Sequence, residues 1–273
     1  MGQVVSLNFH QTFKPEKQYI AAILELAGDA TVRNVKEISS LTGIPNGESS
    51  GKVEPHIIYA CCMGLISYEK KNGGYSLGRT MLGETIYMED PGLQENLTTL
   101  MCHCMMQREN DGAPLWSTII KKIMPLYRTS IKKDMLLKEL VAPFDGKATT
   151  KNIAPFFGSY DSYFDSLDFL VDEGDLIKLG CMQYNREFIY AYAIAFLTYW
   201  DEMYPGQDEI SSVQMDELRF GEVFGWDMQL EYEVLERLAD KGIIRMNRQL
   251  VPYTILKLVE VEDLYCRLFS ELC

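Results

Sequence analysis

The 273-residue chain has few of the residues that the commonest catalytic sites require. It contains only three histidines, no Gly-x-Ser-x-Gly elbow and no glycine-rich loop ending in Lys-Ser/Thr. A Ser/His/Asp catalytic triad is therefore not favoured, because few histidines could take part in it, and a P-loop for nucleotide phosphates is excluded. No apolar run approaches the roughly 20 residues that span a bilayer, and no signal peptide is recognisable. We therefore expect a cytoplasmic protein without a membrane partner.

Cysteine is present but is not arranged as a disulfide framework or a zinc site. Seven cysteines, an odd number without regular spacing, are typical of a reducing cytoplasm. Cys102-His103-Cys104 and Cys61-Cys62 lack the C-x₂₋₄-C spacing of paired zinc ligands. On a helix, Cys102 and Cys104 would point to different faces. We therefore expect buried thiols and identify neither a metal site nor a cofactor.

A helical apolar run followed by two strand-like runs recurs along the chain. The helical runs are at 57–60, 164–170 and 232–238, the first strands at 65–68, 175–178 and 242–245, and the second strands at 75–77, 188–190 and 253–256. Two helices and a two-stranded wing are typical of a winged helix. The sequence therefore predicts a mostly α, α+β fold of tandem winged helix-turn-helix units. The expected wings span residues 66–77, 176–190 and 243–257, and the expected domains span residues 1–90, 91–190 and 191–273.

The first copy of this pattern is the most complete. Pro15 suits the first turn of a helix, where its missing N–H costs nothing. Asn34 can cap a second helix, which Gly43 would end. Asn72-Gly73 supplies the positive φ angles that a tight hairpin turn needs.

Charge divides the chain into two unequal parts. Residues 1–151 hold 17 Lys/Arg and 16 Asp/Glu, a net charge of +1, whereas residues 152–273 hold 9 and 23, a net charge of −14. A surface that binds nucleic-acid phosphates needs cations, so the second part is a poor DNA-binding face. The candidate DNA-binding residues lie at the start of the third helix, at the first wing tip and just after that wing: Lys52, His56, Lys70, Lys71 and Arg79.

Two further charged segments follow the first copy. The cationic segment comprises Lys121, Lys122, Arg128, Lys132, Lys133, Lys138, Lys147 and Lys151. The acidic run Asp161, Asp165, Asp168 and Asp172 has the spacing of one helical face. We expect such a face to be solvated or to bind a basic protein partner rather than to hold Mg²⁺. We therefore expect the acidic C-terminal half to dock protein partners or to self-associate as a homo-oligomer.

The segment Phe9-His10-Gln11-Thr12-Phe13 precedes the first helix. It resembles the Phe-x-Gly-His-Glu-Thr-Phe opening of an uncharacterised bacterial domain family that includes SspB-like proteins, which are encoded with DNA phosphorothioation and phage-defence genes. His10, Thr12 and Phe13 match, whereas Phe9 takes the place of the family's glycine and Gln11 that of its acidic residue. Looser agreement extends through the first winged helix.

The resemblance implies a role in installing sulfur in the DNA backbone, beside a cysteine desulfurase, an ATPase and a sulfurtransferase-like enzyme. It also implies DNA nicking, which would call for a divalent metal, although no nuclease motif maps onto this sequence. Two alternatives remain open from the residues alone. One is a non-catalytic adaptor whose acidic half docks a basic partner, and the other is a homodimeric transcriptional regulator. His10 is either a functional group or a buried hydrogen-bonding residue.

Overall fold

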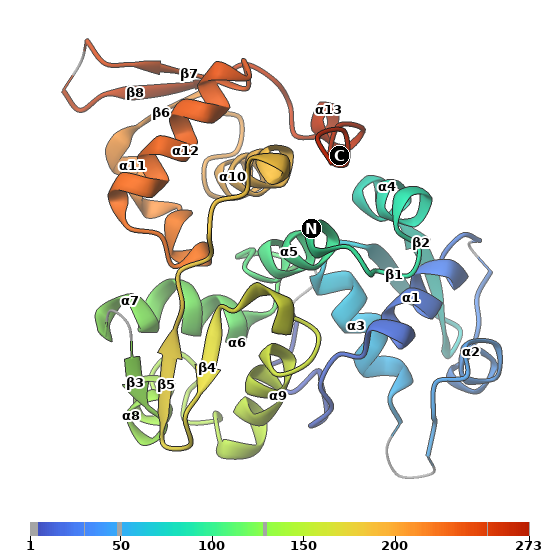
Figure 1. Ribbon diagram of the computed structural model, residues 1–273. Helices are drawn as coiled ribbons and strands as arrows, with labels where there is room; N and C mark the ends of the chain where they lie inside the picture. The colour runs from blue at the N-terminus through green and yellow to red at the C-terminus, as the bar shows by residue number, and fades with distance from the viewer. Residues whose placement is uncertain (1–4, 30, 48–50, 128–129, 250, 273) are drawn as a thin grey trace. The chain divides into compact units, whose positions relative to one another are not determined.

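The computed structural model describes residues 5–29, 31–47, 51–127, 130–249 and 251–272. The chain divides into two compact units, Met1–Leu179 (unit 1) and Gly180–Cys273 (unit 2), which are described separately. Across the described residues, helices predominate and the strands form three small antiparallel sheets (Figure 1). The predicted fold class, α+β and mostly α, is therefore confirmed. The predicted division into three domains is finer than these two units and stays a prediction.

Unit 1 begins with three helices and a hairpin. Their bounds are α1 Lys17–Leu26, α2 Val35–Thr42, α3 Val53–Cys62, β1 Ile66–Lys71 and β2 Gly74–Arg79. Asn34 caps α2 in a capping box with Glu37, and Gly43 ends this helix in the left-handed conformation. Asn72 and Gly73, with φ angles of 49° and 75°, turn the hairpin. The hairpin therefore lies where the sequence predicts the first wing.

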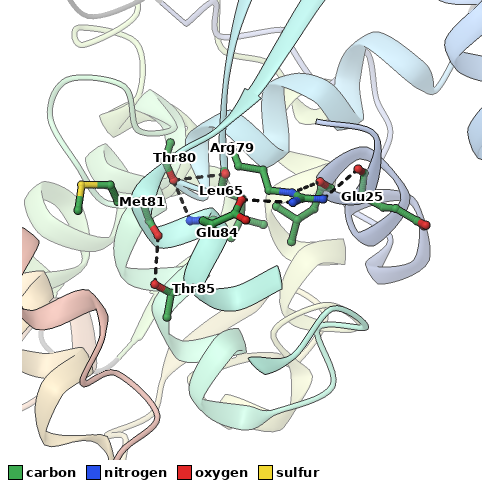
Figure 2. Close-up of polar contacts among 9 residues, drawn as sticks. Glu25, Leu65, Arg79, Thr80, Met81, Glu84 and Thr85 are labelled. Carbon is green, nitrogen blue, oxygen red and sulfur yellow. Dashed lines mark hydrogen bonds and ion pairs between the residues drawn. The ribbon is translucent and has the colours of Figure 1, made fainter. Parts of the chain in front are cut away.

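Two buried helical segments follow this hairpin. Thr80 caps α4 (Met81–Glu89), where its hydroxyl accepts a hydrogen bond from the Gly83 N–H at 2.9 Å and contacts the Leu65 carbonyl (Figure 2). The residues of α5 (Asn96–Met106) are buried from Leu97 to Met106. This helix therefore runs through the core of unit 1 and carries the buried thiols that the sequence predicts.

A second helix-and-sheet segment completes unit 1. Its elements are α6 Pro114–Ser117, a π-helical turn Thr118–Ile123, α7 Met124–Tyr127, β3 Ser130–Lys132, α8 Lys133–Glu139, α9 Thr150–Tyr160, a 3₁₀ turn Asp165–Leu167, β4 Leu170–Asp172 and β5 Leu176–Leu179. The strands pair in the order β3-β5-β4. Gly174, with φ of 81°, turns β4 into β5.

The predicted position of the second wing is wrong in two respects. Residues 164–170 are not an α-helix, because α9 ends at Tyr160 and only the 3₁₀ turn Asp165–Leu167 precedes β4. Residues 188–190 are not a strand, because Ile189 begins the long helix α10 of unit 2. Periodicity cannot separate a short apolar run in a strand from one in a buried helix, and here burial of the whole helix decides the outcome.

The acidic run does not share a helical face, so this prediction is also wrong. Asp161 follows the last residue of α9, and Asp165 lies in the 3₁₀ turn. Asp168 has a left-handed φ of 48°, and Asp172 belongs to β4. The helical spacing is lost because the chain leaves the helix before the second aspartate.

Unit 2 has one sheet and a core built around α10. Its elements are a 3₁₀ turn Arg186–Phe188, α10 Ile189–Met203, β6 Glu209–Ser211, α11 Ser212–Glu217, a 3₁₀ turn Gly221–Phe224, α12 Met228–Asp240, β7 Ile244–Asn247, β8 Thr254–Lys257 and α13 Glu262–Tyr265. Phe224 stacks on Trp226 at 4.2 Å between ring centroids, and both contact Tyr192 on α10. The β7–β8 hairpin lies where the sequence predicts the third wing.

We call each helix-and-hairpin segment a module: residues 17–79, residues 114–179 and residues 189–257. The second and third modules share the order helix, strand, two helices and hairpin, and their sheet orders β3-β5-β4 and β6-β8-β7 correspond strand for strand. In the first module, an antiparallel bridge from Arg33 to Tyr75 stands where the other two have their first strand. The order of elements therefore repeats along the chain, but the second copy lies at other residues than the sequence pattern predicts. Within the described residues, the structure has no helix long and apolar enough to cross a bilayer.

Candidate functional site

The helix that would read DNA in the first module is mostly buried. Of the ten residues of α3, eight are buried, including His56. The His56 Nε2 accepts a hydrogen bond from the Glu16 N–H at 3.2 Å, and Nδ1 donates to the Lys52 carbonyl at 2.6 Å. Burial lowers the pKa of His56, so this imidazole is neutral near pH 7. Its two nitrogens are occupied within the protein, which leaves none for a phosphate.

Arg79 also serves the packing of the first module. Its guanidinium donates hydrogen bonds to the carbonyls of Leu24 at 2.9 Å and Glu25 at 3.1 Å, which lie at the end of α1 (Figure 2). It pairs with Glu84 on α4 at 3.2 Å and lies 3.3 Å from the centroid of the Tyr87 ring. A cation suits the carbonyl end of a helix. Arg79 therefore joins α1 to α4, and only 11% of its side chain is exposed.

Lys52 lies in an aromatic and acidic setting. Its ammonium pairs with the Glu16 carboxylate at 2.7 Å and lies 5.5 Å and 5.7 Å from the ring centroids of Tyr19 and Phe13. The contacts to Glu16 raise the pKa of Lys52, so the side chain keeps its charge. Less than a third of the side chain is exposed.

Lys70 and Lys71 are the accessible members of the predicted set. They lie at the β1–β2 turn with 64% and 56% of their side chains exposed. Lys70 is 3.6 Å from the Glu54 carboxylate, and Lys71 pairs with Glu69. Exposed pairs of this kind contribute little to stability and leave the ammonium groups reachable by another anion.

The cationic segment is spread over several environments. Lys121 is buried, whereas Lys122, Lys133 and Lys138 pair with nearby carboxylates. Arg128 lies outside the described residues. The two lysines nearest α9, Lys147 and Lys151, lie at a different kind of surface, which the N-terminal motif helps to build.

The aromatic residues of the N-terminal motif anchor it to the core of unit 1. The Phe9 ring is buried at centroid distances of 4.8 Å from Tyr59 and 6.0 Å from Trp116. The Tyr59 hydroxyl donates to the Phe13 carbonyl at 2.9 Å. Phe9 stands where the resembled family has glycine, yet positive φ occurs at Gln11 and Thr12 instead. The motif here therefore uses Phe9 for packing.

His10 is a buried residue with one hydrogen bond in place. Only 1% of it is exposed, and its Nδ1 accepts from the Thr12 N–H at 3.2 Å. Burial lowers the pKa of His10 to about 4, although the Leu7 backbone partly opposes this. The His10 ring lies beside the rings of Phe9 and Trp116, at centroid distances of 5.3 Å and 6.2 Å.

His10 contributes to a cleft of about 420 Å³ between the motif and the start of α9. The lining residues are Asn8, His10, Gln11, Thr12, Lys147, Thr149, Lys151 and Asn152. A side-chain hydrogen bond from Asn152 to Asn8 joins the two segments. The sequence shows both the motif and the lysines, but only the tertiary structure brings these distant segments together.

The cysteine and histidine residues of α5 face the interior. Burial raises the pKa of the Cys102 thiol to about 12, and the Tyr163 hydroxyl lies 3.6 Å from its sulfur. His103 is fully buried, with Nδ1 3.0 Å from the Tyr160 hydroxyl. A protonated thiol is a poor metal ligand and nucleophile. In the part of the chain that the structure describes, no three His, Cys, Asp or Glu side chains gather as a metal site would require.

Comparison with known proteins identifies a shared fold. No family profile matches the sequence, and no curated protein matches it. A magnesium ion-bound crystal structure of SspB matches with a TM-score of 0.76 and 13% identity, covering 99% of this chain and 88% of that one. A second crystal structure of SspB matches with a TM-score of 0.74 and 14% identity over the same shares. The chain therefore has an SspB-like fold over nearly its whole length, whereas the sequence resemblance covers only the N-terminal motif and, more loosely, the segment through the first hairpin.

Proposed function

We propose that this protein is a DNA-binding component of a bacterial DNA phosphorothioation and phage-defence system. The observation that carries the proposal is the fold similarity to SspB over 99% of the chain. The N-terminal motif supports it independently, because His10, Thr12 and Phe13 occupy matching positions. We interpret the three helix-and-hairpin modules as winged helices, an architecture that commonly contacts nucleic acid.

Unit 1 is the proposed DNA-binding side. Its first hairpin presents Lys70 and Lys71 to solvent, and phosphates can displace the exposed carboxylates that these lysines contact. Unit 2 carries 8 Lys/Arg and 17 Asp/Glu, a net charge of −9. Its α12 begins at the cap residue Asp227 and carries Glu233, and these two exposed carboxylates would repel phosphate. The fold that presents this surface is stabilised by Lys52, His56 and Arg79.

Salt-dependent binding to a DNA duplex tests this proposal. The double variant Lys70→Glu/Lys71→Glu should weaken binding by about tenfold and lower the slope of log K against log salt by about two. Arg248→Glu is the matched control, because Arg248 lies on the hairpin of unit 2 with a similarly exposed side chain. Fluorescence anisotropy of a labelled duplex measures both effects. Equal losses in the two variants, or no binding by the unmodified protein, would refute the proposal.

Nicking requires a separate test. The magnesium ion belongs to the solved SspB structure, and the described residues of this chain do not form a cluster of three metal-binding side chains. Within the described ranges, the geometry therefore offers no centre through which strand cleavage can be derived. Relaxation of a supercoiled plasmid by the protein with Mg²⁺ distinguishes a nickase from a binding component.

The charge of unit 2 supports a second role as a docking surface. A net charge of −9 over 94 residues suits a basic protein partner. By the resemblance to SspB-like systems, the candidate partners are a cysteine desulfurase, an ATPase and a sulfurtransferase-like enzyme, with a second copy of this chain as an alternative. Co-purification of these proteins at low and high salt tests the role, since charge-based docking weakens with salt.

A further inference from the structure

The cleft between the N-terminal motif and α9 has an unusual balance of charge for this protein. Two lysines, Lys147 and Lys151, lie among amide, hydroxyl and imidazole side chains, and the described lining includes no carboxylate. The chain as a whole carries 39 Asp/Glu against 26 Lys/Arg. Lys147 has an exposed carboxylate, that of Asp145, 3.8 Å away, but Asp145 does not line the cleft. The cleft is therefore a local cationic site in an acidic protein.

The backbone at the edge of this cleft adds to its attraction for anions. Thr149 and Asn152 form a capping box at the start of α9, an eleven-residue helix. The capping box pairs the N–H groups of Thr149 and Asn152. The other amides of a first helical turn have no acceptor within their own helix, and the helix dipole places positive potential there. Oxyanions bind at such positions when further donors converge on them.

The hydrogen bonding of His10 supplies an independent observation that points to an anionic ligand. Because Nδ1 accepts from the Thr12 N–H, the neutral ring carries its proton on Nε2. That Nε2 is buried and makes no hydrogen bond of regular geometry with the described residues, although the Leu7 backbone lies close enough to the ring to favour its charged form. A buried donor without an acceptor destabilises the folded state. An oxyanion in the cleft that His10 lines would provide an acceptor for this donor.

The chain around His10 is held in a conformation that has a cost of its own. Gln11 and Thr12, both exposed, have φ angles of 48° and 75°, which side chains with a Cβ rarely adopt. Thr12 is β-branched, which increases the strain. The hydrogen bond to His10 and the contact between Asn8 and Asn152 hold this turn at the start of α9. The motif is thus held beside the two lysines, which line the same cleft.

We propose that this cleft binds a phosphate group, with Lys147, Lys151 and the first turn of α9 as the anion-binding elements and His10 as a positioning residue. The site is defined by oxyanion chemistry and does not rest on the proposed role in DNA binding. Both a phosphodiester of nucleic acid and a free phosphate or phosphomonoester present the same oxygens. Its volume of about 420 Å³ accommodates a phosphate together with part of the group that carries it.

Titration of the full chain with inorganic phosphate, followed by calorimetry, tests the site. Saturable binding is expected, with a loss of at least tenfold in Lys147→Glu/Lys151→Glu. Lys36→Glu is the matched control, because Lys36 occupies the second position of α2, as Lys151 does in α9, and α2 also begins with a capping box. Both lysines are exposed, so their replacement leaves the core intact. Absence of saturable binding, or an equal loss in Lys36→Glu, overturns the proposal.

Histidine NMR and competition complete the test. Phosphate should shift the imidazole signals of His10 and leave those of His56 and His103 in place, because the latter two make hydrogen bonds within the protein. Shifts of all three signals, or of none, contradict the site. If a short oligonucleotide displaces phosphate, the ligand of the cleft is a phosphodiester of nucleic acid. If only a phosphomonoester displaces it, the ligand is a free phosphate or a phosphomonoester. Phosphate binding is measured without DNA. The outcome of the DNA-binding test with Lys70→Glu/Lys71→Glu is therefore independent of the outcome of this test.

Discussion

Units 1 and 2 are built from similar helix-and-hairpin modules, but burial lowers the pKa of histidines in unit 1 and raises that of a glutamate in unit 2. The histidines of the chain, at positions 10, 56 and 103, all belong to unit 1 and are buried there. Unit 2 has no histidine and instead holds Glu231, a carboxyl whose pKa burial raises to about 7. The same arrangement of elements therefore tolerates either a buried base or a buried acid. The stability of the two units should respond to pH in opposite directions.

The setting of Glu231 explains its raised pKa. Burial is the main cause, and the nearby carboxylates of Asp216 and Glu222 act in the same direction. A hydrogen bond from the Gly221 N–H at 2.9 Å favours the charged form but does not overcome burial. A carboxyl in this state holds its proton near neutral pH.

The largest difference in stability between the two units should come from a substitution at a glycine of unit 1. A Cβ on Gly83 would overlap the carbonyl oxygen of Leu65, where α4 crosses the start of β1. Gly83→Ala should therefore destabilise unit 1 by about 3 kcal/mol, because backbone cannot move aside cheaply. Hydrogen exchange should lose protection along α5 of unit 1 while α10 of unit 2 keeps it. Gly78→Ala is the control, since its Cβ would meet only the Ser67 hydroxyl at 3.5 Å. Similar losses in both variants would contradict this reading.

The next largest effect should be a loss of stability in unit 2 as the pH rises. The folded-state pKa of Glu231, about 7, lies above the ordinary value of 4.5. The stability that the protonated carboxyl contributes is fully present below pH 4.5 and is lost as pH rises through 7. Between pH 5 and pH 8 this loss amounts to about 2.5 kcal/mol. Glu231→Gln should remove this dependence, which denaturant unfolding of the two proteins at both pH values measures. Parallel pH profiles for them would show that Glu231 is not the source.

Acid should have the opposite effect on unit 1. The pKa of His10 in the folded chain, about 4, lies below the ordinary value of 6.5. The stability contributed by the neutral ring is present above pH 6.5 and is lost as pH falls towards 4. From pH 7 to pH 5 the loss is about 2 kcal/mol. His10→Asn, whose side-chain oxygen can still accept from the Thr12 N–H, should flatten the profile of unit 1 in hydrogen exchange. If the variant keeps the full acid sensitivity, His56 or another group carries it.

Local signals in the sequence were reliable where a turn or cap needs a particular residue. Asn34, Gly43 and Asn72-Gly73 predict the second helix and the first hairpin, because side-chain capping and positive φ are local requirements. The hairpin at 244–257 was also predicted correctly. The second wing was misplaced because residues 188–190 are equally compatible with a strand and a buried helix.

The candidate site was predictable in composition but not in arrangement. His56 and Arg79 have the residue types that a phosphate contact needs, yet the structure uses both within the first module. Their burial depends on neighbours far away in the sequence, such as Glu16 and Leu24. Lys70 and Lys71 stay exposed because a hairpin turn is a local surface feature.

By itself, the sequence determined the fold class, the first and third hairpins, and the separation of an acidic C-terminal half from the rest, since these follow from local propensity and composition. Only the tertiary structure decided which cations remain free and that residues 8–12 meet residues 147–152 at a carboxylate-free cleft. The physical reason is that burial and charge pairing are properties of contacts between distant segments. A residue's type sets what it can bind, and the packed chain decides whether that group is available.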